Sequence, residues 1–522
     1  MIGECSVNSP LEHILVVGGG TAGWLTAAVL AAGHNASLES GIRVTLIESP
    51  DVNTIGVGEG TWPSMRDTLR KIGVSERDFI RECSASFKQG SKFVGWRNGD
   101  DEEFYYHPFS LPHGYLHANV VPYWQAEHPD ISLASAFSSQ EALCQLGKAP
   151  KQAQTPEFAA VANYAYHLDA GKFATFLQKH CTQKLGVRHV LDHVTQVKPA
   201  ANGDIAALAT KQSGDLPADL FIDCTGVASL LLGKHYKVPF VSQESVLFNN
   251  RAIAMQVPYA ADDDPIASAT IATARRAGWI WDIGLPSRRG IGYVYSSEHE
   301  SDDQAEQTLR QYIDSDRRSG HAEDIQARRL KFNPGYRQHF WHRNCVAVGM
   351  SAGFIEPLEA SAIALVELSA AMIRDELPAN RKIMDTVASR FNQRFTYRWE
   401  RVIEFLKLHY VLSSRTDSAY WTDHRKQEGI PGRLAELLEL WEYQPPSRHD
   451  FTQTDEIFPS ASYQYVLYGM GFKTLPRETS CQRDSFEIAH RYFEENQRQV
   501  EQQIKGLTEN RALIDHMVRT PG

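Results

Sequence analysis

The start of the chain combines apolar runs with a glycine-rich turn, in an order that indicates parallel α/β structure. Residues 13–17, His-Ile-Leu-Val-Val, are mostly apolar and have the β-branched character of a buried strand. A glycine-rich segment follows at 18–23, and a helical pattern covers residues 24–32. A second apolar run at 43–47 ends in Glu48. We therefore predict a strand, a tight turn, a helix and a second strand.

The glycines of this turn suit a dinucleotide pyrophosphate. Gly18 allows a sharp turn, Gly20 allows the backbone to approach the phosphates, and Gly23 allows the helix to pack against the sheet. The amino end of the helix offers unpaired N–H groups to the phosphates, and Glu48 is expected to accept hydrogen bonds from a ribose. Because strand, helix and acid occur together, we predict a dinucleotide site. Only one such fingerprint is visible, which favours a single dinucleotide cofactor.

Two later segments predict further strands of the same sheet. Residues 219–226 and 344–349 are apolar runs that end in a glycine turn. A helix is expected to begin near Pro357, because proline suits the first helical turn. Glu356 is expected to be an acid favoured by the dipole of that helix. The nucleotide-binding module is therefore expected to be discontinuous in sequence.

Composition and charge exclude several classes of protein. The 522 residues carry a net charge of -10 without a basic block, which argues against a nucleic-acid partner. No apolar run reaches the roughly 18 residues of a membrane helix, so we expect no membrane partner. The seven cysteines lack close spacing, which favours neither a disulfide framework nor a metal site. No export signal is visible at the amino terminus, so we expect a cytoplasmic protein, and a homodimer is left open.

A second glycine-rich segment bears on which dinucleotide is bound. Gly56-Val57-Gly58-Glu59-Gly60-Thr61 follows the second strand, and such a flexible ribbon can lie against a large flat cofactor. The segment resembles the flavin strap of the flavin-dependent tryptophan halogenase family. Further blocks similar to those of the family follow in the family's order, at residues 86–88, 92–96, 107–109, 123–124, 164–170, 221–226, 278–283 and 354–359.

The resemblance implies that the cofactor is FAD, used as FADH2. It also implies an α/β fold: an FAD-binding, Rossmann-like dinucleotide module of the flavin monooxygenase type with a mixed α+β, largely helical C-terminal substrate module. We place the first module at residues 10–375, with inserted segments near 96–164 and 241–334 that contribute to the substrate side, and the second at 376–522. The expected cofactor-binding residues are Gly18, Gly20, Thr21, Ala22, Gly23, Glu48, Gly56, Val57, Gly58, Glu59 and Gly349.

Lys88 and Glu359 are the expected catalytic residues. The apolar neighbours Phe87, Phe93 and Val94 predict that the Lys88 ammonium is partly desolvated and that its pKa is lowered. By resemblance, Lys88 is the lysine that delivers the electrophilic halogen, by hydrogen bonding to hypohalous acid or as a halogenated amine. Glu359 matches the active-site glutamate, placed to stabilise the cationic ring intermediate or the lysine and to help proton loss.

Two tryptophans are expected to separate the flavin from the substrate. Trp279 and Trp281 lie two positions apart, so on a strand both indoles point to one side. They match the family's tryptophan pair, with Gly284 in place of the family's proline. The resemblance puts the halide site at Ser361 and Ala362, where the alanine departs from the family's pattern. Chloride and bromide both stay open.

The resemblance also assigns the substrate side. His107 and Phe109, with Pro108 between them, match the residues that sandwich the indole ring, and such stacking fixes which carbon faces the lysine. Tyr463 resembles the first of the family's two tyrosines that hold the amino-acid end of tryptophan, but Gln464 replaces the second. Indole or another electron-rich aromatic is therefore at least as strongly expected as free tryptophan.

The reaction implied by the resemblance uses reduced FAD, O2 and chloride or bromide. Hypohalous acid passes the tryptophan pair to Lys88, and the bound ring is then halogenated. A separate flavin reductase is expected, because no nicotinamide site is evident. The first alternative is a flavin-dependent monooxygenase that hydroxylates an aromatic substrate. The second is a flavin-binding or sensing protein in which Lys88 has only a structural role.

Overall fold

The protein is described by a computed structural model, which covers residues 9–52, 58–318, 325–475 and 480–519. Its nucleotide-binding sheet has six strands in the order β20-β21-β12-β1-β2-β8, and each neighbouring pair is parallel except β20 with β21. The strands are β1 (His13–Val17), β2 (Arg43–Glu48), β8 (Arg188–Leu191), β12 (Leu220–Asp223), β20 (Trp341–His342) and β21 (Cys345–Ala347). The two later segments therefore return to this sheet, as the sequence predicts.

A second large sheet carries the tryptophan pair. Its seven strands follow the order β18-β14-β17-β16-β15-β5-β6, and its neighbours are antiparallel except β15 with β5. The strands are β5 (Gly90–Val94), β6 (Phe104–Pro108), β14 (Arg251–Pro258), β15 (Thr270–Arg275), β16 (Gly278–Gly284), β17 (Arg288–Tyr295) and β18 (Arg328–Lys331).

Three small sheets complete the β structure. One joins β3 (Gly58–Gly60), β7 (Ala165–Asp169) and β4 (Ser86–Lys88), so the end of the glycine-rich ribbon and the strand of Lys88 pair with the same central strand. The other two contain β9 (Val194–Pro199), β10 (Ile205–Thr210) and β11 (Asp215–Pro217), and β13 (Phe240–Ser242), β19 (Gly335–Arg337) and β22 (Gly353–Phe354).

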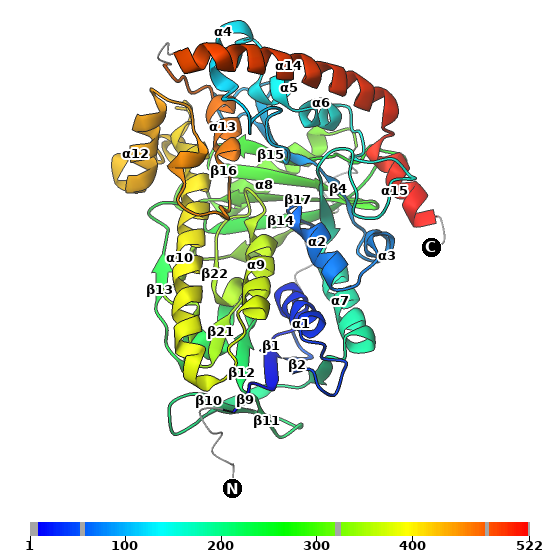
Figure 1. Cartoon of the computed structure of the whole chain (residues 1–522), viewed down its shortest axis with the longest axis vertical. Helices are drawn as coiled ribbons and strands as arrows, with labels where there is room; N and C mark the ends of the chain where they lie inside the picture. Colours follow the sequence, from blue (N-terminus) through cyan, green and yellow to red (C-terminus); the bar gives the residue numbers. More distant parts are fainter. Residues whose placement is uncertain (1–8, 53–57, 319–324, 476–479, 520–522) are drawn as a thin grey trace.

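Helices cover both large sheets. α1 (Thr21–Gly33) packs against α7 (Ala170–Lys184) and α9 (Ser361–Asp375) beside the nucleotide-binding sheet. The 31-residue α10 (Arg381–Val411) runs along one side of the molecule, and α14 (Ser480–Gly506) crosses the end opposite β9–β11 (Figure 1). The remaining α-helices are α2 (Ser64–Lys71), α3 (Glu76–Glu82), α4 (Val121–Glu127), α5 (Leu133–Phe137), α6 (Gln140–Gln145), α8 (Asp302–Ser315), α11 (Ala419–Asp423), α12 (Gly432–Trp441), α13 (Ser460–Gly469) and α15 (Asn510–Arg519).

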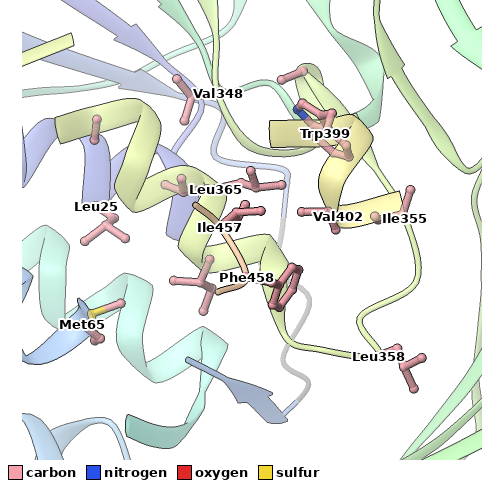
Figure 2. Close-up of a cluster of buried hydrophobic side chains, with 14 of the residues drawn as sticks. Leu25, Met65, Val348, Ile355, Leu358, Leu365, Trp399, Val402, Ile457 and Phe458 are labelled. Atoms are coloured by element: carbon pink, nitrogen blue, oxygen red, sulfur yellow. The ribbon is translucent and has the colours of Figure 1, made fainter. Parts of the chain in front are cut away.

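The hydrophobic core is continuous around α9. Figure 2 shows Leu365 on α9, with the buried side chains of Leu25 of α1, Met65 of α2 and Trp399 of α10 around this helix. Phe458, from the loop before α13, lies at the amino end of α9 in the same view and stacks on Phe405 of α10 with ring centroids 3.9 Å apart. The start of α9 is therefore held by apolar packing from several elements.

The start of α9 differs from the prediction. The helix begins at Ser361, four residues after Pro357, because Ala360 adopts the left-handed conformation with φ 54° and ψ 38°. The N–H of Ala360 donates to the carbonyl of Pro357 at 3.0 Å, which closes a turn before the helix. The expected position of Glu356 as a helix-start acid is therefore wrong: Glu356 lies in the loop before the turn.

Within the described residues, none of the helices combines the length and the apolar character that a membrane crossing needs.

Candidate active site

The β1–α1 turn and the start of α9 line one cavity of about 510 Å³. Its walls include the backbone after β1, the carboxylate at the end of β2, and the first turn of α9. Of the residues expected from the sequence to bind cofactor or halide, the cavity is lined by Gly18, Gly20, Thr21, Ala22, Glu48, Glu59, Gly349, Ser361 and Ala362. Gly56 and Val57 lie outside the described residues.

The β1–α1 turn fits a dinucleotide phosphate. Gly18 has φ +111°, and a Cβ there would come within 2.3 Å of the carbonyl oxygen of Cys224. The space above Gly20 is open, since no atom lies within 4 Å of a Cβ built there. No side chain caps α1, so its first N–H groups stay available to an anion. Gly23 lies close to the carbonyl of Gly18, since a Cβ at Gly23 would come within 1.8 Å of that oxygen.

Two carboxylates of the cavity have raised pKa values. Burial raises the pKa of Glu48, whose Oε1 lies 2.8 Å from Nε2 of His189. Burial and the charge of Asp169 raise the pKa of Glu59 to about 7. Gly58, in the same strand as Glu59, pairs with Asp169 across the small sheet. Glu48, at the end of β2, therefore lies where the sequence expects a ribose partner, and Glu59 lies on the cavity wall.

Lys88 is a buried amine at the end of β4. Its exposed fraction is 1%, and its Nζ lies 5.3 Å from the centroid of the Phe109 ring. Burial lowers the pKa of Lys88 to about 8, although the charge of Glu359 opposes the shift. The direction agrees with the apolar neighbours seen in the sequence. An amine with a pKa near 8 can exchange a proton close to neutral pH, which suits a group in catalysis.

Glu359 is a buried carboxylate held by two histidines. Its Oε1 lies 3.0 Å from Nδ1 of His107 and 3.2 Å from Nε2 of His409. Burial alone would raise its pKa, but the charges and hydrogen bonds of the two histidines lower the pKa to about 2. Nδ1 of His409 also lies 2.9 Å from the carbonyl oxygen of Phe405. Both nitrogens of His409 thus face oxygen atoms, one on Glu359 and one on the backbone of Phe405.

The sequence gives no sign of the role of His409. It stands in an apolar stretch of α10, and only the folded chain brings it to Glu359, fifty positions away. The spacing of aromatic residues around it predicts a buried helix face but no carboxylate partner.

Trp279 and Trp281 lie side by side on β16. Their ring centroids are 6.4 Å apart with an interplanar angle of 62°, and both residues are buried. Trp281 covers Gly292 of β17, because a Cβ at that glycine would come within 2.1 Å of the indole. Trp279 packs against Trp96, with ring centroids 6.5 Å apart. The pair therefore packs between the large sheet and an aromatic cluster.

The substrate residues expected from the sequence separate into two groups. His107 and Pro108 end β6 next to Phe109, so these three lie together near Lys88 and Glu359. Tyr463 packs on Phe405, which lies between it and His107, with centroid separations of 4.8 and 5.7 Å.

The helix that carries Tyr463 offers another aromatic residue nearer to His107. The ring centroid of Tyr465 lies 6.3 Å from that of His107. The side-chain N–H of Gln464 donates to the carbonyl of Pro446, so this amide is occupied by the protein itself. No sequence signal distinguishes Tyr465 from its neighbours.

Within the described residues, no group of three or more His, Cys, Asp and Glu side chains is arranged to hold a metal ion.

Comparisons with known proteins agree with this geometry. The family model for tryptophan halogenase matches residues 13–485. The crystal structure of a tryptophan halogenase from Shewanella frigidimarina is 51% identical and gives a TM-score of 0.95 over 98% of each chain. The tryptophan 6-halogenase SttH of Streptomyces toxytricini is 33% identical over 481 residues, which are 88% of this chain and 89% of that protein. BrvH, a flavin-dependent halogenase from a Brevundimonas species, is 30% identical with a TM-score of 0.84 over 97% of this chain and 99% of that chain.

These likenesses extend over both the nucleotide-binding sheet and the helical carboxyl-terminal part. They confirm the α/β fold class with an FAD-type dinucleotide module and a largely helical carboxyl-terminal region. The chain belongs to the family of flavin-dependent tryptophan halogenases.

Proposed function

We propose that the protein uses reduced FAD, O2 and chloride or bromide to halogenate an electron-rich aromatic ring such as indole or an indole derivative. Lys88 relays the oxidised halogen to the ring, and Glu359 assists. A separate flavin reductase supplies FADH2. SttH and the Shewanella frigidimarina protein are both named as tryptophan halogenases, which supports a substrate with an indole-type ring.

The observation that supports this proposal most strongly is the position of Lys88 relative to the cavity. Among the described residues, the cavity wall includes Ser361 and Ala362 but neither Lys88 nor Glu359. Gly60 lies between the two regions, since a Cβ there would lie 3.1 Å from Nζ of Lys88 and 3.4 Å from Cβ of Ala360. The buried amine is thus next to the start of α9 but outside the cofactor cavity. Such a separation suits an oxidant made on one side and used on the other.

The residues present fit FAD and a halide. The uncapped start of α1 suits the pyrophosphate, and the start of α9, which also lacks a side-chain cap, offers N–H groups at Ser361 and Ala362 to a halide. Reduced FAD, when bound, supplies the activation of O2 that oxidises the halide. Trp279 and Trp281 keep the organic substrate away from the cofactor and exclude bulk water.

On the substrate side, the chain supplies charge and orientation. The Lys88 ammonium donates a hydrogen bond to the hypohalous acid and makes its halogen more electrophilic. His107 and Phe109 hold the aromatic ring. Glu359 stays ionised because its pKa is about 2, so it stabilises the cationic ring intermediate as the C–X bond forms. The ring proton and the hydroxide of the hypohalous acid leave together as water.

The test combines purified protein, a flavin reductase with NADH, FAD, O2 and a panel of indoles, with bromide or chloride. Product masses identify the reaction. A halogenated product that disappears without halide supports the proposal. A product heavier by one oxygen, formed without halide, would show a monooxygenase instead, and FAD binding without turnover of any substrate would favour the sensing alternative.

A further inference from the structure

Glu356 is buried beside the tryptophan pair and accepts three hydrogen bonds through one oxygen. Its Oε2 accepts from Nε1 of Trp279 at 2.6 Å, from Nδ2 of Asn249 at 2.5 Å and from the hydroxyl of Tyr410 at 2.8 Å. The exposed fraction of Glu356 is 1%, and Trp279 is equally buried. Burying a carboxylate is unfavourable even when it accepts three hydrogen bonds, which indicates that this position has a role beyond packing.

One loop carries both buried carboxylates of the site. Glu356 and Glu359 are three residues apart before α9, and they are bound by the consecutive α10 residues Tyr410 and His409. The loop is therefore tied to α10 at two points. One tie holds Glu359, the carboxylate near Lys88, and the other holds Glu356, the carboxylate that binds Trp279.

We propose that Glu356 is a positioning residue that fixes the indole of Trp279, and through it the wall between the cofactor cavity and the Lys88 side. The inference rests on the proposed function, because it assigns a residue to the separation that this function needs. Nothing in the sequence motif distinguishes this role from that of a helix-start acid.

The indole of Trp279 is held by a hydrogen bond in addition to its packing. Trp96 and Trp281 contact the ring at centroid distances of 6.5 and 6.4 Å, and a flat ring between such neighbours can still turn about its side-chain torsions. The bond to Glu356 selects one orientation. Turning the ring would leave a buried N–H without a partner, which is unfavourable by more than a typical hydrogen bond contributes.

Two substitutions of Glu356 distinguish the loss of the hydrogen-bond acceptor from the loss of the negative charge. Glu356→Gln keeps an oxygen that can accept from the indole, whereas Glu356→Met has a similar length and removes the acceptor. With 15N-labelled indole nitrogens, the cross-peak of Trp279 is identified by its loss in Trp279→Phe. We expect this cross-peak to move towards the position of an unbonded indole in Glu356→Met and to move much less in Glu356→Gln.

The second readout is the yield of halogenated product per reduced flavin consumed. We expect Glu356→Met to lower this yield by about tenfold, as loss of one such hydrogen bond allows, and Glu356→Gln to restore most of it. In the Trp279→Phe background, which lacks the N–H, Glu356→Met should lower the yield no further. Glu367→Met is the matched control, since Glu367 is a buried carboxylate on α9 that binds Ser64 and Thr68 instead of a tryptophan.

The outcomes are distinguishable. An unmoved Trp279 cross-peak in Glu356→Met would overturn the inference, as would a moved cross-peak with a wild-type yield. If the wild-type protein halogenates no substrate, the proposed function fails, and the cross-peak still decides whether Glu356 fixes the indole. If Glu356→Met does not fold, Glu356→Asp, which withdraws the carboxylate by one methylene group, should give the same shift and loss.

Discussion

Gly60 lies against the ammonium of Lys88: a Cβ at position 60 would come within 3.1 Å of Nζ. Gly60 ends the short strand β3, and Lys88 ends β4, so the two meet from opposite edges of one small sheet. The glycine-rich ribbon therefore does more than border the cofactor cavity. Its last glycine also leaves room for the amine.

This contact predicts the effect of Gly60→Ala. The added methyl group must displace the lysine amine by a few tenths of an ångström, and small misplacements of a reacting group lower the rate. We expect halogenation to fall by roughly threefold to tenfold, while FAD affinity and thermal stability change little. Product rate, FAD titration and thermal unfolding measure the three quantities. Unchanged halogenation would mean that the amine does not need its present position.

The pH dependence of product yield tests which form of Lys88 acts. Its pKa of about 8 means that the ammonium fraction falls as the pH rises through 8. If the ammonium activates hypohalous acid, the yield of halogenated product per reduced flavin should fall over the same range. A yield that instead rises through pH 8 would show that the neutral amine, and thus a halogenated amine, is the acting form.

The lowered pKa of Lys88 also predicts how the free energy of unfolding depends on pH. The folded pKa of Lys88 lies below the ordinary value of 10.5, so between about pH 8 and 10.5 the unfolded chain binds more protons at this group than the folded chain. The group therefore destabilises the fold below pH 8, and this penalty disappears as the pH rises towards 10.5. Glu359 has the opposite sign: it stabilises the fold above pH 4.5, and that contribution is lost as the pH falls through about 2.

His409→Phe should raise the pKa of Glu359, because one of the two histidines that keep the carboxylate ionised is lost. We expect the acid limb of the halogenation rate to move to higher pH and the rate at neutral pH to fall by about tenfold. The matched control is His113→Phe, since His113 is paired with Glu495 at a partly exposed site. An acid limb in the same place as in the wild type would contradict the role given to His409.

Gly292→Ala should displace Trp281, since a Cβ at position 292 would lie within 2.1 Å of the indole. We expect the yield of halogenated product per reduced flavin to fall at least threefold, with stability lowered by roughly 1–3 kcal/mol through overpacking. The yield is measured at a temperature where the variant is fully folded. Gly432→Ala, where the added Cβ meets no atom within 4 Å, controls for the loss of a glycine. A wild-type yield in Gly292→Ala would contradict the role proposed for the tryptophan wall.

The sequence predicts those parts of the structure that depend on the local pattern of apolar residues and glycines. The run at 13–17, its glycine turn and the acid at the end of the next strand occupy the expected places, because each follows from periodicity and glycine stereochemistry. The start of α9 was not predictable, since it depends on a left-handed alanine at position 360.

The contacts that complete the candidate site depend on the fold. His409 reaches Glu359 only because α10 packs beside the loop before α9, and Gly292 lies under Trp281 only because of the register between β16 and β17. Neither relationship has a signature in local sequence. The expected role of Glu356 as a helix-start acid is wrong for the same reason. Its partners come from strand β16, from helix α10 and from Asn249, all far away in the sequence.

The most direct test of the proposed lysine relay is Lys88→Ala, with Lys92→Ala as its control. Lys92 is a half-buried lysine four residues away, whose Nζ lies 4.3 Å from the ring centroid of Phe104. Both variants are supplied with reductase, FAD, O2, bromide and indole, and flavin reoxidation and brominated product are measured together. We predict that Lys88→Ala reoxidises the flavin at the wild-type rate without brominated product, while Lys92→Ala retains both. Normal bromination by Lys88→Ala would contradict the relay.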